Sequence, residues 1–124
     1  MLTLKEVATH FALKPDTVAR KVRGGDLEAF RINRHYRCEW HQVWACEQGR
    51  APKPAQRERY RTALLTTKMI TAKLKVSKKT VAGWVSLGMP TRNVFGAVRY
   101  NPHDVTDWLR QKISAELPDM WWVE

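Results

Sequence analysis

The residues with the clearest potential for chemistry are the cations between Pro15 and Arg37. Apolar residues at helical spacing, Val18 and Val22 among them, predict a short helix that starts at Pro15. Its outer face then carries Asp16, Arg20 and Arg23, and its flanks carry Thr17 and Lys21. Guanidinium groups donate paired hydrogen bonds to phosphates and to the O6 and N7 atoms of guanine. The segment is therefore a candidate for contacts with nucleic acid.

A hairpin is predicted directly after this helix. Gly24 and Gly25 end the helix, because glycine accepts left-handed backbone without steric cost, and a strand pattern follows. A polar three-residue turn over residues 33–35 then reverses the chain. This register buries two apolar pairs, Ile32 with Tyr36 and Phe30 with Cys38. It leaves cationic side chains at the tip and on the outer face, suited to a narrow minor groove, and these are Arg31, Arg34, His35 and Arg37.

Length and composition exclude several other classes. The chain has 124 residues, 44% of them hydrophobic, and no apolar run reaches the ~18 residues of a membrane span. Its N-terminus carries charge early, unlike a signal peptide, and only two cysteines occur, which favours a reducing cytosol over a disulfide scaffold. The net charge of +10 favours a polyanionic partner.

The sequence contains an internal repeat. When residues 3–25 are aligned with residues 66–88 at an offset of 63, seven of the 23 positions are identical. At an offset of 62, Arg37, His41 and Val43 then match Arg99, His103 and Val105. Because the matches fall on core and turn positions, the chain is predicted to hold two copies of one small domain.

We place the first copy at residues 1–48, a basic, proline-containing linker at 49–64 and the second copy, with an apolar C-terminal tail, at 65–124. The linker carries five basic residues and one acidic residue, a net charge of +4. It could be a solvated connector or an arm that lies on DNA phosphates. Alternatively, its residues 56–64 could extend the next helix. The tail residues Trp121 and Trp122 could pack on their own copy or brace the two copies.

Each copy is predicted to contain two helices, a hairpin and a third helix. The fold class is therefore mainly α with small β-hairpin wings, an α+β arrangement. Helix caps are expected at Thr3, with Glu6 completing a capping box, and at Ser77 and Asn101. The third helix of the first copy is expected over residues 41–48.

The second copy carries a weaker signal for base contacts. Its second helix begins with Lys78 and Lys79, but Gly83 stands where the first copy has Arg20. Glycine presents nothing to a base edge, so we expect the second copy to hold phosphates while the first copy reads sequence. The second hairpin has an apolar tip at Phe95. We expect this tip to fold back on its own hairpin, with a wedge between bases or contact with a neighbouring protein as alternatives.

Other chemistry is weakly represented. A zinc site could be built from His35, Cys38, His41 and Cys46. Against this, the repeat aligns the two cysteines with Tyr100 and Trp108, which are natural core positions. The sequence shows no glycine-rich phosphate loop, carboxylate cluster or Ser/His/Asp set. We therefore expect no enzymatic activity, no cofactor and no metal.

These motifs resemble a known family. Residues 2–37, LTLKEVATHFALKPDTVARKVRGGDLEAFRINRHYR, are similar to the excisionase-type, MerR-related winged helix-turn-helix, and the likeness covers nearly all of residues 2–48. Residues 80–109, TVAGWVSLGMPTRNVFGAVRYNPHDVTDWL, are similar to the same superfamily and to the DNA-binding domain of phage terminase small subunits.

The resemblance implies that the second helix of each copy enters the major groove and that the hairpin, as a wing, enters the adjacent minor groove. Binding roles are implied in the first copy for Thr17, Arg20, Lys21, Arg34 and Arg37. In the second copy they are implied for Lys78, Lys79, Thr80 and Arg99. Proteins of the excisionase type act without catalysis, by bending DNA so that an integrase can carry out excision.

We therefore expect a non-enzymatic, sequence-specific, double-stranded DNA-binding protein of a phage or bacterial mobile element. Its role would be that of a recombination directionality or architectural factor in the bacterial cytoplasm, associated with the nucleoid. Expected partners are duplex DNA and an integrase or further copies on DNA, with no membrane and no small-molecule substrate. Alternatives are a transcriptional repressor or activator, a terminase-type packaging factor, a protein-interaction adaptor and an accessory nuclease or integrase enzyme.

Overall fold

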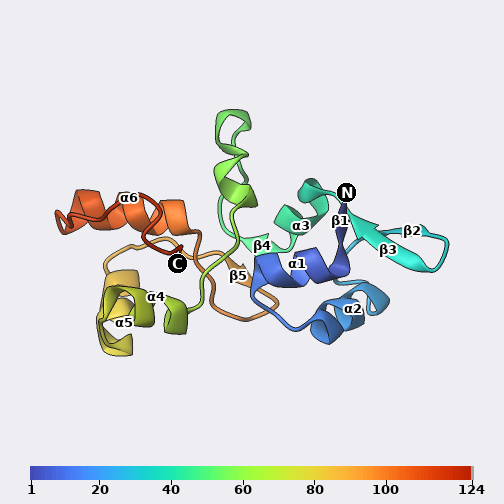
Figure 1. The fold of residues 1–124 in the computed structure, drawn as a ribbon, viewed down its shortest axis with the longest axis horizontal. Coiled ribbons are helices and arrows are strands. Elements are labelled where there is room, and N and C mark those ends of the chain that lie inside the picture. Colours follow the sequence, from blue (N-terminus) through green and yellow to red (C-terminus); the bar gives the residue numbers. More distant parts are fainter. Residues whose placement is uncertain (124) are drawn as a thin grey trace.

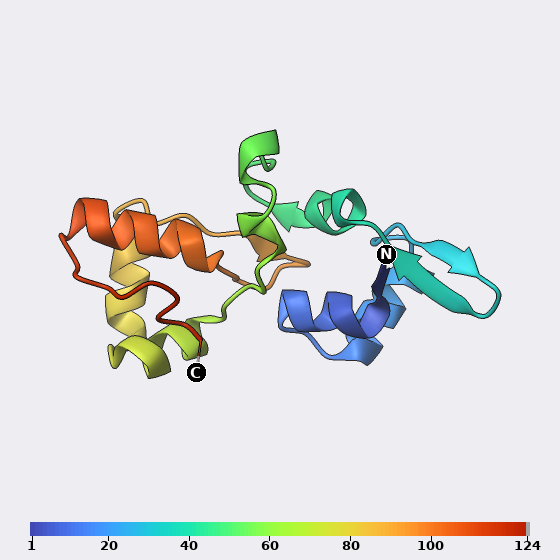
Figure 2. The same cartoon turned by 45° about the horizontal axis from the view of Figure 1, so that its top comes forward.

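The computed structural model describes residues 1–123 and has a mixed α+β architecture of short helices and small antiparallel sheets (Figure 1). The first copy contains β1 (Leu2–Thr3), α1 (Leu4–Phe11), α2 (Pro15–Arg23), β2 (Phe30–Ile32), β3 (His35–Cys38), α3 (Trp40–Ala45) and β4 (Glu47–Gln48). The linker contains 3₁₀ turns at Pro54–Gln56 and Arg59–Arg61. The second copy contains α4 (Thr67–Leu74), α5 (Lys78–Ser86), β5 (Asn93–Val94) and α6 (Pro102–Lys112). The copies lie along the long axis with part of the linker rising between them (Figures 1 and 2).

The backbone reproduces the internal repeat. Helices α4 and α5 begin and end 63 residues after α1 and α2, and α6 begins 62 residues after α3. The residue that follows the first helix is left-handed in both copies, with φ of 55° at Ala12 and 54° at Lys75. Antiparallel pairing also recurs at matching places, between β1 and β3 in the first copy and between Leu65 and Tyr100 in the second. The element boundaries thus recur at the same offsets as the sequence matches.

Local capping explains where most of the helices begin. Thr3 and Glu6 form the predicted capping box, since each side chain accepts a hydrogen bond from the other residue's backbone N–H. The Ser77 hydroxyl accepts from the N–H of Thr80, and the Asn101 side chain caps α6. Helix α2 has no side-chain cap and begins instead with proline at its first turn, where a missing N–H costs nothing.

Each copy has an apolar core, but the core of the first copy is completed from outside it. Val7, Phe11 and Val18 belong to a cluster that also includes Leu64 of the linker and Val94 of the second copy. The second cluster is built from residues 65–109. A unit of ~60 residues buries only about 60% of the surface that its unfolded chain exposes, so recruited side chains matter for the first copy.

The first hairpin forms in a register that differs from the predicted one. It lies in a three-stranded sheet of order β1-β3-β2, and its two-residue turn opposes Phe30 with Arg37, Arg31 with Tyr36 and Ile32 with His35. Asn33 takes the left-handed conformation, with φ of 56°, that asparagine tolerates in tight turns. The prediction buried Phe30 and Ile32, yet they are 43% and 49% exposed. Arg31 and Arg37 lie on opposite faces rather than sharing one, because a slip of one residue reverses the alternation.

The third helix of the first copy is shorter than predicted. Helix α3 ends at Ala45, and the expected continuation to residue 48 is wrong because Glu47 and Gln48 form strand β4. This strand pairs antiparallel with β5, opposing Glu47 with Val94 and Gln48 with Asn93. A two-stranded sheet therefore joins the first copy to the second.

The second hairpin also forms, but its tip does not fold back on itself as predicted. Val94 and Ala97 exchange two backbone hydrogen bonds of 2.9 Å across a turn in which Phe95 and Gly96 both have positive φ. Such a turn suits the twist of a hairpin but is unfavourable for phenylalanine. The Phe95 ring contacts Phe11 of the first copy edge-on, with 5.8 Å between ring centroids. This packing across the copies offsets the unfavourable backbone conformation.

The end of the linker is packed between the copies, so neither a fully solvated connector nor an extension of α4 describes it. Tyr60 and Leu64 are buried. The carbonyl of Tyr60 accepts from the Trp44 indole at 3.0 Å, and its hydroxyl donates to Asp104 at 3.0 Å. The N–H of Leu64 donates to the carbonyl of His10 at 2.8 Å. The C-terminal tail packs on its own copy, since Trp121 and Trp122 lie against the second core.

A buried charge network fixes the β4–β5 junction. The two side chains at its centre are almost inaccessible to solvent, with Glu47 0% and Arg92 2% exposed. Arg92 Nε donates to one carboxylate oxygen of Glu47 at 2.6 Å, and its Nη1 donates to the carbonyl of Arg50 at 2.6 Å. The second carboxylate oxygen lies 3.0 Å from His10 Nε2. The guanidinium also stacks on the Tyr60 ring, 4.6 Å from its centroid.

Replacing Arg92 with methionine should destabilise the protein strongly. The change leaves a buried carboxylate without its main partner, and removing one member of a buried pair typically costs about 3–5 kcal/mol. We expect a loss of this size in the free energy of unfolding, measured by urea denaturation. Asp119→Asn, at an exposed ion pair with Arg110, is the matched control and should change little. A stability for Arg92→Met as close to wild type as that of the control would contradict this reading of the network.

Candidate nucleic-acid interface

Helix α2 presents the cations expected of it. Val18 is buried against the first core, while Arg20 and Arg23 are exposed and Thr17 is half-buried. Lys21 is partly committed to internal contacts. Its ammonium lies 3.9 Å from Asp26 and 5.1 Å from the centroid of the Phe95 ring. Arg20 and Arg23 are therefore the predicted cations of this helix that are most available to a ligand.

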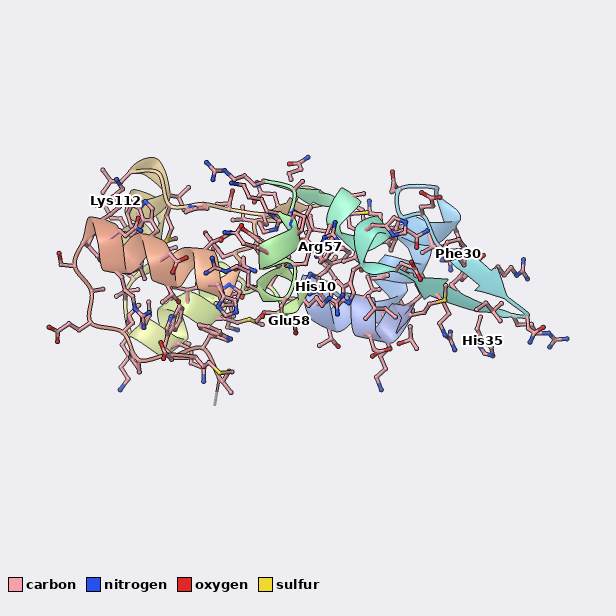
Figure 3. The ribbon with its side chains drawn as sticks, turned by 90° about the horizontal axis from the view of Figure 1, so that it is seen from above. His10, Phe30, His35, Arg57, Glu58 and Lys112 are labelled. Atoms are coloured by element: carbon pink, nitrogen blue, oxygen red, sulfur yellow. The ribbon has the colours of Figure 1, made fainter. Side chains whose placement is uncertain are left out.

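The first hairpin projects from the end of the molecule and carries its cations on two faces. In the view from above, Phe30 and His35 lie at this end and Lys112 lies toward the opposite end (Figure 3). Arg34 occupies the turn and is exposed. Arg31 Nε donates to the carbonyl of Asn33 at 3.2 Å, which directs this side chain back along the turn. Of the predicted hairpin side chains, Arg31, Arg34 and His35 are thus exposed, and the apolar residues Phe30 and Ile32 beside them are exposed as well.

Arg37, at the base of the hairpin, is half-buried and has local partners. Its Nη1 donates to the carbonyl of Tyr36 at 2.8 Å. The side chain also lies near Glu6, whose pKa is lowered mainly by hydrogen bonds from Thr3 and to a small extent by the charge of Arg37. Arg37 is therefore less available than Arg34.

Helix α5 exposes Lys78, Lys79 and Thr80 in its first turn. The Thr80 hydroxyl lies 2.9 Å from that of Ser77, so it belongs partly to the helix cap. Gly83 is exposed, and a Cβ built on it would meet no atom within 4 Å. The molecule itself therefore does not require glycine at this position.

Arg99, for which a role in DNA binding was implied, instead binds backbone carbonyls of the first copy. Its Nε donates to the carbonyl of Phe11 at 2.8 Å, and its Nη2 donates to the carbonyl of Ala12 at 3.0 Å. These carbonyls lie at the end of α1, where backbone acceptors lack helical partners and favour cations. Burial lowers the pKa of the Arg99 guanidinium. The residue fastens the second copy to the first and is not a free contact for DNA.

The two candidate helices lie on the same side of the molecule. Helices α2 and α5 occupy the lower side in Figure 1, whereas α3 and the projecting part of the linker occupy the upper side. Their exposed cations are Arg20 and Arg23 on α2 and Lys78 and Lys79 on α5, and the first hairpin adds Arg34 at the end of the molecule.

The cysteine and histidine residues weighed for zinc do not gather into a site. Among residues 1–123, no group of three or more His, Cys, Asp or Glu side chains is placed to hold a metal ion. Burial raises the pKa of both thiols, that of Cys46 to about 11. Both therefore remain protonated near neutral pH, whereas zinc requires the thiolate. Within the same residues, no helix is long and apolar enough to cross a membrane.

Sequence reasoning missed a second group of functional candidates, at α3 and the linker. Trp40 and Trp44 flank a cleft together with Arg57 and Arg61. The alternating arginines of the linker indicated a cationic surface here, but their spacing alone does not show which of them form ion pairs within the molecule. Arg59 forms one, because it donates to Asp107 at 2.8 Å.

Comparison of the chain with family models, curated proteins and solved structures finds no match.

Replacing Gly83 with alanine should stabilise the protein. Alanine is favoured over glycine inside a helix by roughly 1 kcal/mol, and the added methyl group meets open space. We expect a gain of up to about 1 kcal/mol in the free energy of unfolding, measured by urea denaturation. Gly25→Ala is the contrasting control, because its φ of 83° makes any side chain unfavourable. A loss of stability in Gly83→Ala would show that the backbone here needs glycine.

Proposed function

We propose that this protein is a tandem winged helix-turn-helix protein that binds double-stranded DNA without catalysis. The observation that carries the proposal is the repeated placement of an exposed cationic helix, α2 and then α5, on one side of a firmly joined molecule (Figure 1). A major groove admits such a helix, and lysine and arginine bind its phosphates. The projecting first hairpin with Arg34 at its turn supports a wing in the minor groove.

The two copies would contribute unequally. In the first copy, α2 offers arginines for base edges, and the hairpin is free to reach a groove. In the second, α5 offers Lys78 and Lys79. The hairpin of the second copy is occupied in the contact with the first, through Val94 and Phe95. We infer that the first copy reads sequence while the second holds phosphates, so that the complete site on DNA is asymmetric.

The biological role that best fits such a protein is that of an excisionase-like recombination directionality or architectural factor of a phage or mobile element. Footprinting on the DNA around its own coding region tests this role. Direct repeats beside an attachment site would support it. A palindrome over a promoter would instead make the protein a transcriptional regulator.

Duplex binding should weaken steeply as salt is added. Each neutralised phosphate contributes about −0.9 to the slope of log K against log salt, so the four exposed cations other than Arg20, which is assigned to a base, predict a slope of about −3.6. Fluorescence anisotropy with a labelled duplex measures it. Arg34→Ala should reduce the steepness by about 0.9, and Lys112→Ala, on α6, should leave it unchanged. Salt-independent binding, or no binding to any duplex, would favour the protein-interaction adaptor.

Arginine on α2 and lysine on α5 should respond differently to DNA sequence. Arg20→Ala should cost about 1–3 kcal/mol on a selected site and relax the preference for it, because a base contact is lost. Lys79→Ala should weaken all sequences alike, because a phosphate contact positions without specifying. Affinities for a selected site and for several single-base variants measure both effects. A larger change of sequence preference in Lys79→Ala than in Arg20→Ala would overturn the division between the copies.

A further inference from the structure

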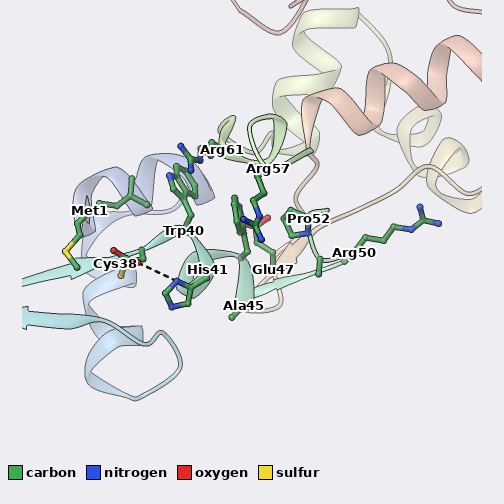
Figure 4. Close-up of a pocket in the computed structure, with 15 residues that line it drawn as sticks. Met1, Cys38, Trp40, His41, Ala45, Glu47, Arg50, Pro52, Arg57 and Arg61 are labelled. Atoms are coloured by element: carbon green, nitrogen blue, oxygen red, sulfur yellow. Dashed lines mark ion pairs between the residues drawn. The ribbon is translucent and has the colours of Figure 1, made fainter. Parts of the chain in front are cut away.

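A cleft opens between α3 and the linker, on the side of the molecule away from α2 and α5 (Figures 1 and 4). Its volume is about 860 Å³. Polar and apolar groups both line it, and the apolar ones include Met1, Trp40, Trp44, Ala45 and Pro52. The proposed DNA contacts use none of these residues, so the cleft calls for a separate explanation.

The aromatic wall of the cleft is preorganised. Trp40 and Trp44 stack with 5.8 Å between ring centroids and 26° between ring planes. The edge-on contact of Trp40 with His10 and the hydrogen bond from Trp44 to the carbonyl of Tyr60 hold both rings in place. Because this wall is already ordered, a ligand would lose little free energy in arranging it.

One side of the cleft is cationic. Arg57 and Arg61 lie along this side, whereas Arg50 extends away from it (Figure 4). The guanidinium of Arg61 sits over the Trp40 ring, 6.0 Å from its centroid. Both Arg57 and Arg61 are exposed. The cleft thus combines an apolar wall with two accessible positive charges, which complements a ligand that is both apolar and acidic.

The internal repeat allows the cleft-lining face of α3 to be compared with the equivalent face of α6, which is covered. Among the residues of α3 that line the cleft, His41, Trp44 and Ala45 correspond at an offset of 62 to His103, Thr106 and Asp107 of α6. In the second copy the C-terminal tail covers that face. The Trp121 indole donates to the Thr106 hydroxyl at 2.7 Å, and the Trp122 ring packs on His103 with 5.0 Å between centroids.

The covering tail is itself apolar and acidic. Its Asp119 pairs with Arg110 of α6 at 3.0 Å, while Leu117, Trp121 and Trp122 pack on the second core. The matching face of α3 has no such cover among residues 1–123 and remains an open cleft. The second copy therefore supplies a template for the occupant, which is an extended segment with an aromatic anchor and carboxylates beside it.

Nucleic acid fits the cleft less well than a peptide. Trp40 is already in contact with Arg61, Trp44 and His10, which leaves less of its ring for a base. The apolar wall by contrast matches side chains such as leucine or tryptophan.

We propose that this cleft binds an extended acidic segment of a partner protein, with an aromatic or large aliphatic side chain against Trp44 and carboxylates paired to Arg57 and Arg61. This assignment does not depend on DNA binding. Because the cleft and the proposed DNA-binding side face apart, the protein can hold a duplex and the partner segment together.

The test uses a phage-displayed library of random peptides selected on the full chain. We expect selected sequences to carry net negative charge and an aromatic or aliphatic residue. Affinities of the synthetic peptides are then measured by fluorescence polarisation. Arg57→Gln/Arg61→Gln should weaken them at least about tenfold, since two charge pairs are lost. Lys112→Gln is the matched control and should leave them unchanged.

A second variant guards against indirect effects. Ala45 is exposed and lines the cleft, so Ala45→Glu adds a repelling charge without removing a contact, and it should also weaken the peptides. Duplex affinity of Arg57→Gln/Arg61→Gln should stay within about twofold of wild type, which separates this site from the DNA-binding proposal. Selection of basic peptides or of none, or binding that all these variants leave unchanged, would overturn the assignment. So would binding of labelled oligo(dT) in the cleft, or self-association of the protein that Arg57→Gln/Arg61→Gln abolishes, because a second copy of the chain would then be the occupant.

Discussion

The buried ion pair between Glu47 and Arg92 is the contact on which the arrangement of the two copies depends. Burying two charges is costly, and only short contacts that satisfy both groups offset the loss of hydration. Here His10, the Arg50 carbonyl and the Tyr60 ring complete the network. Because so specific a constellation forms in only one geometry, it fixes strand β4 against β5. The candidate helices are thereby held at a set spacing, which a flexible tether could not achieve.

The two hairpins occupy equivalent places in the repeat but have different surroundings. The first hairpin projects into solvent, whereas the second turns inward and completes the core of its neighbour through Val94 and Phe95. The equivalent arginines diverge in the same way. Arg37 and Arg99 each donate to the carbonyl of the preceding residue, but only Arg99 also donates to the carbonyls at the end of α1. The hairpin of the second copy is thus part of a rigid junction and is not accessible like the first, which agrees with the unequal share in DNA binding that we propose.

The third helices diverge as well. Helix α6 is covered by the tail that follows it, and helix α3 faces an open cleft beside the linker arginines. The two candidate binding surfaces therefore lie on different sides of the molecule. Cationic helices face one way, and an aromatic wall with Arg57 and Arg61 faces the other. A protein that brings another protein to a duplex needs such a separation, because neither partner then blocks the other.

The sequence by itself determined the local features: the repeat, the helix starts at Thr3, Ser77 and Asn101, and the existence of both hairpins. These depend on residues a few positions apart, so capping and periodicity suffice to predict them. Only the tertiary structure decided the register of the first hairpin, the pairing of β4 with β5 and the role of Arg99. Those outcomes join residues far apart in the chain. The chemistry of a side chain limits which groups it can bind. Which of those groups it does bind depends on the residues that folding brings within contact distance, and the local sequence does not specify them.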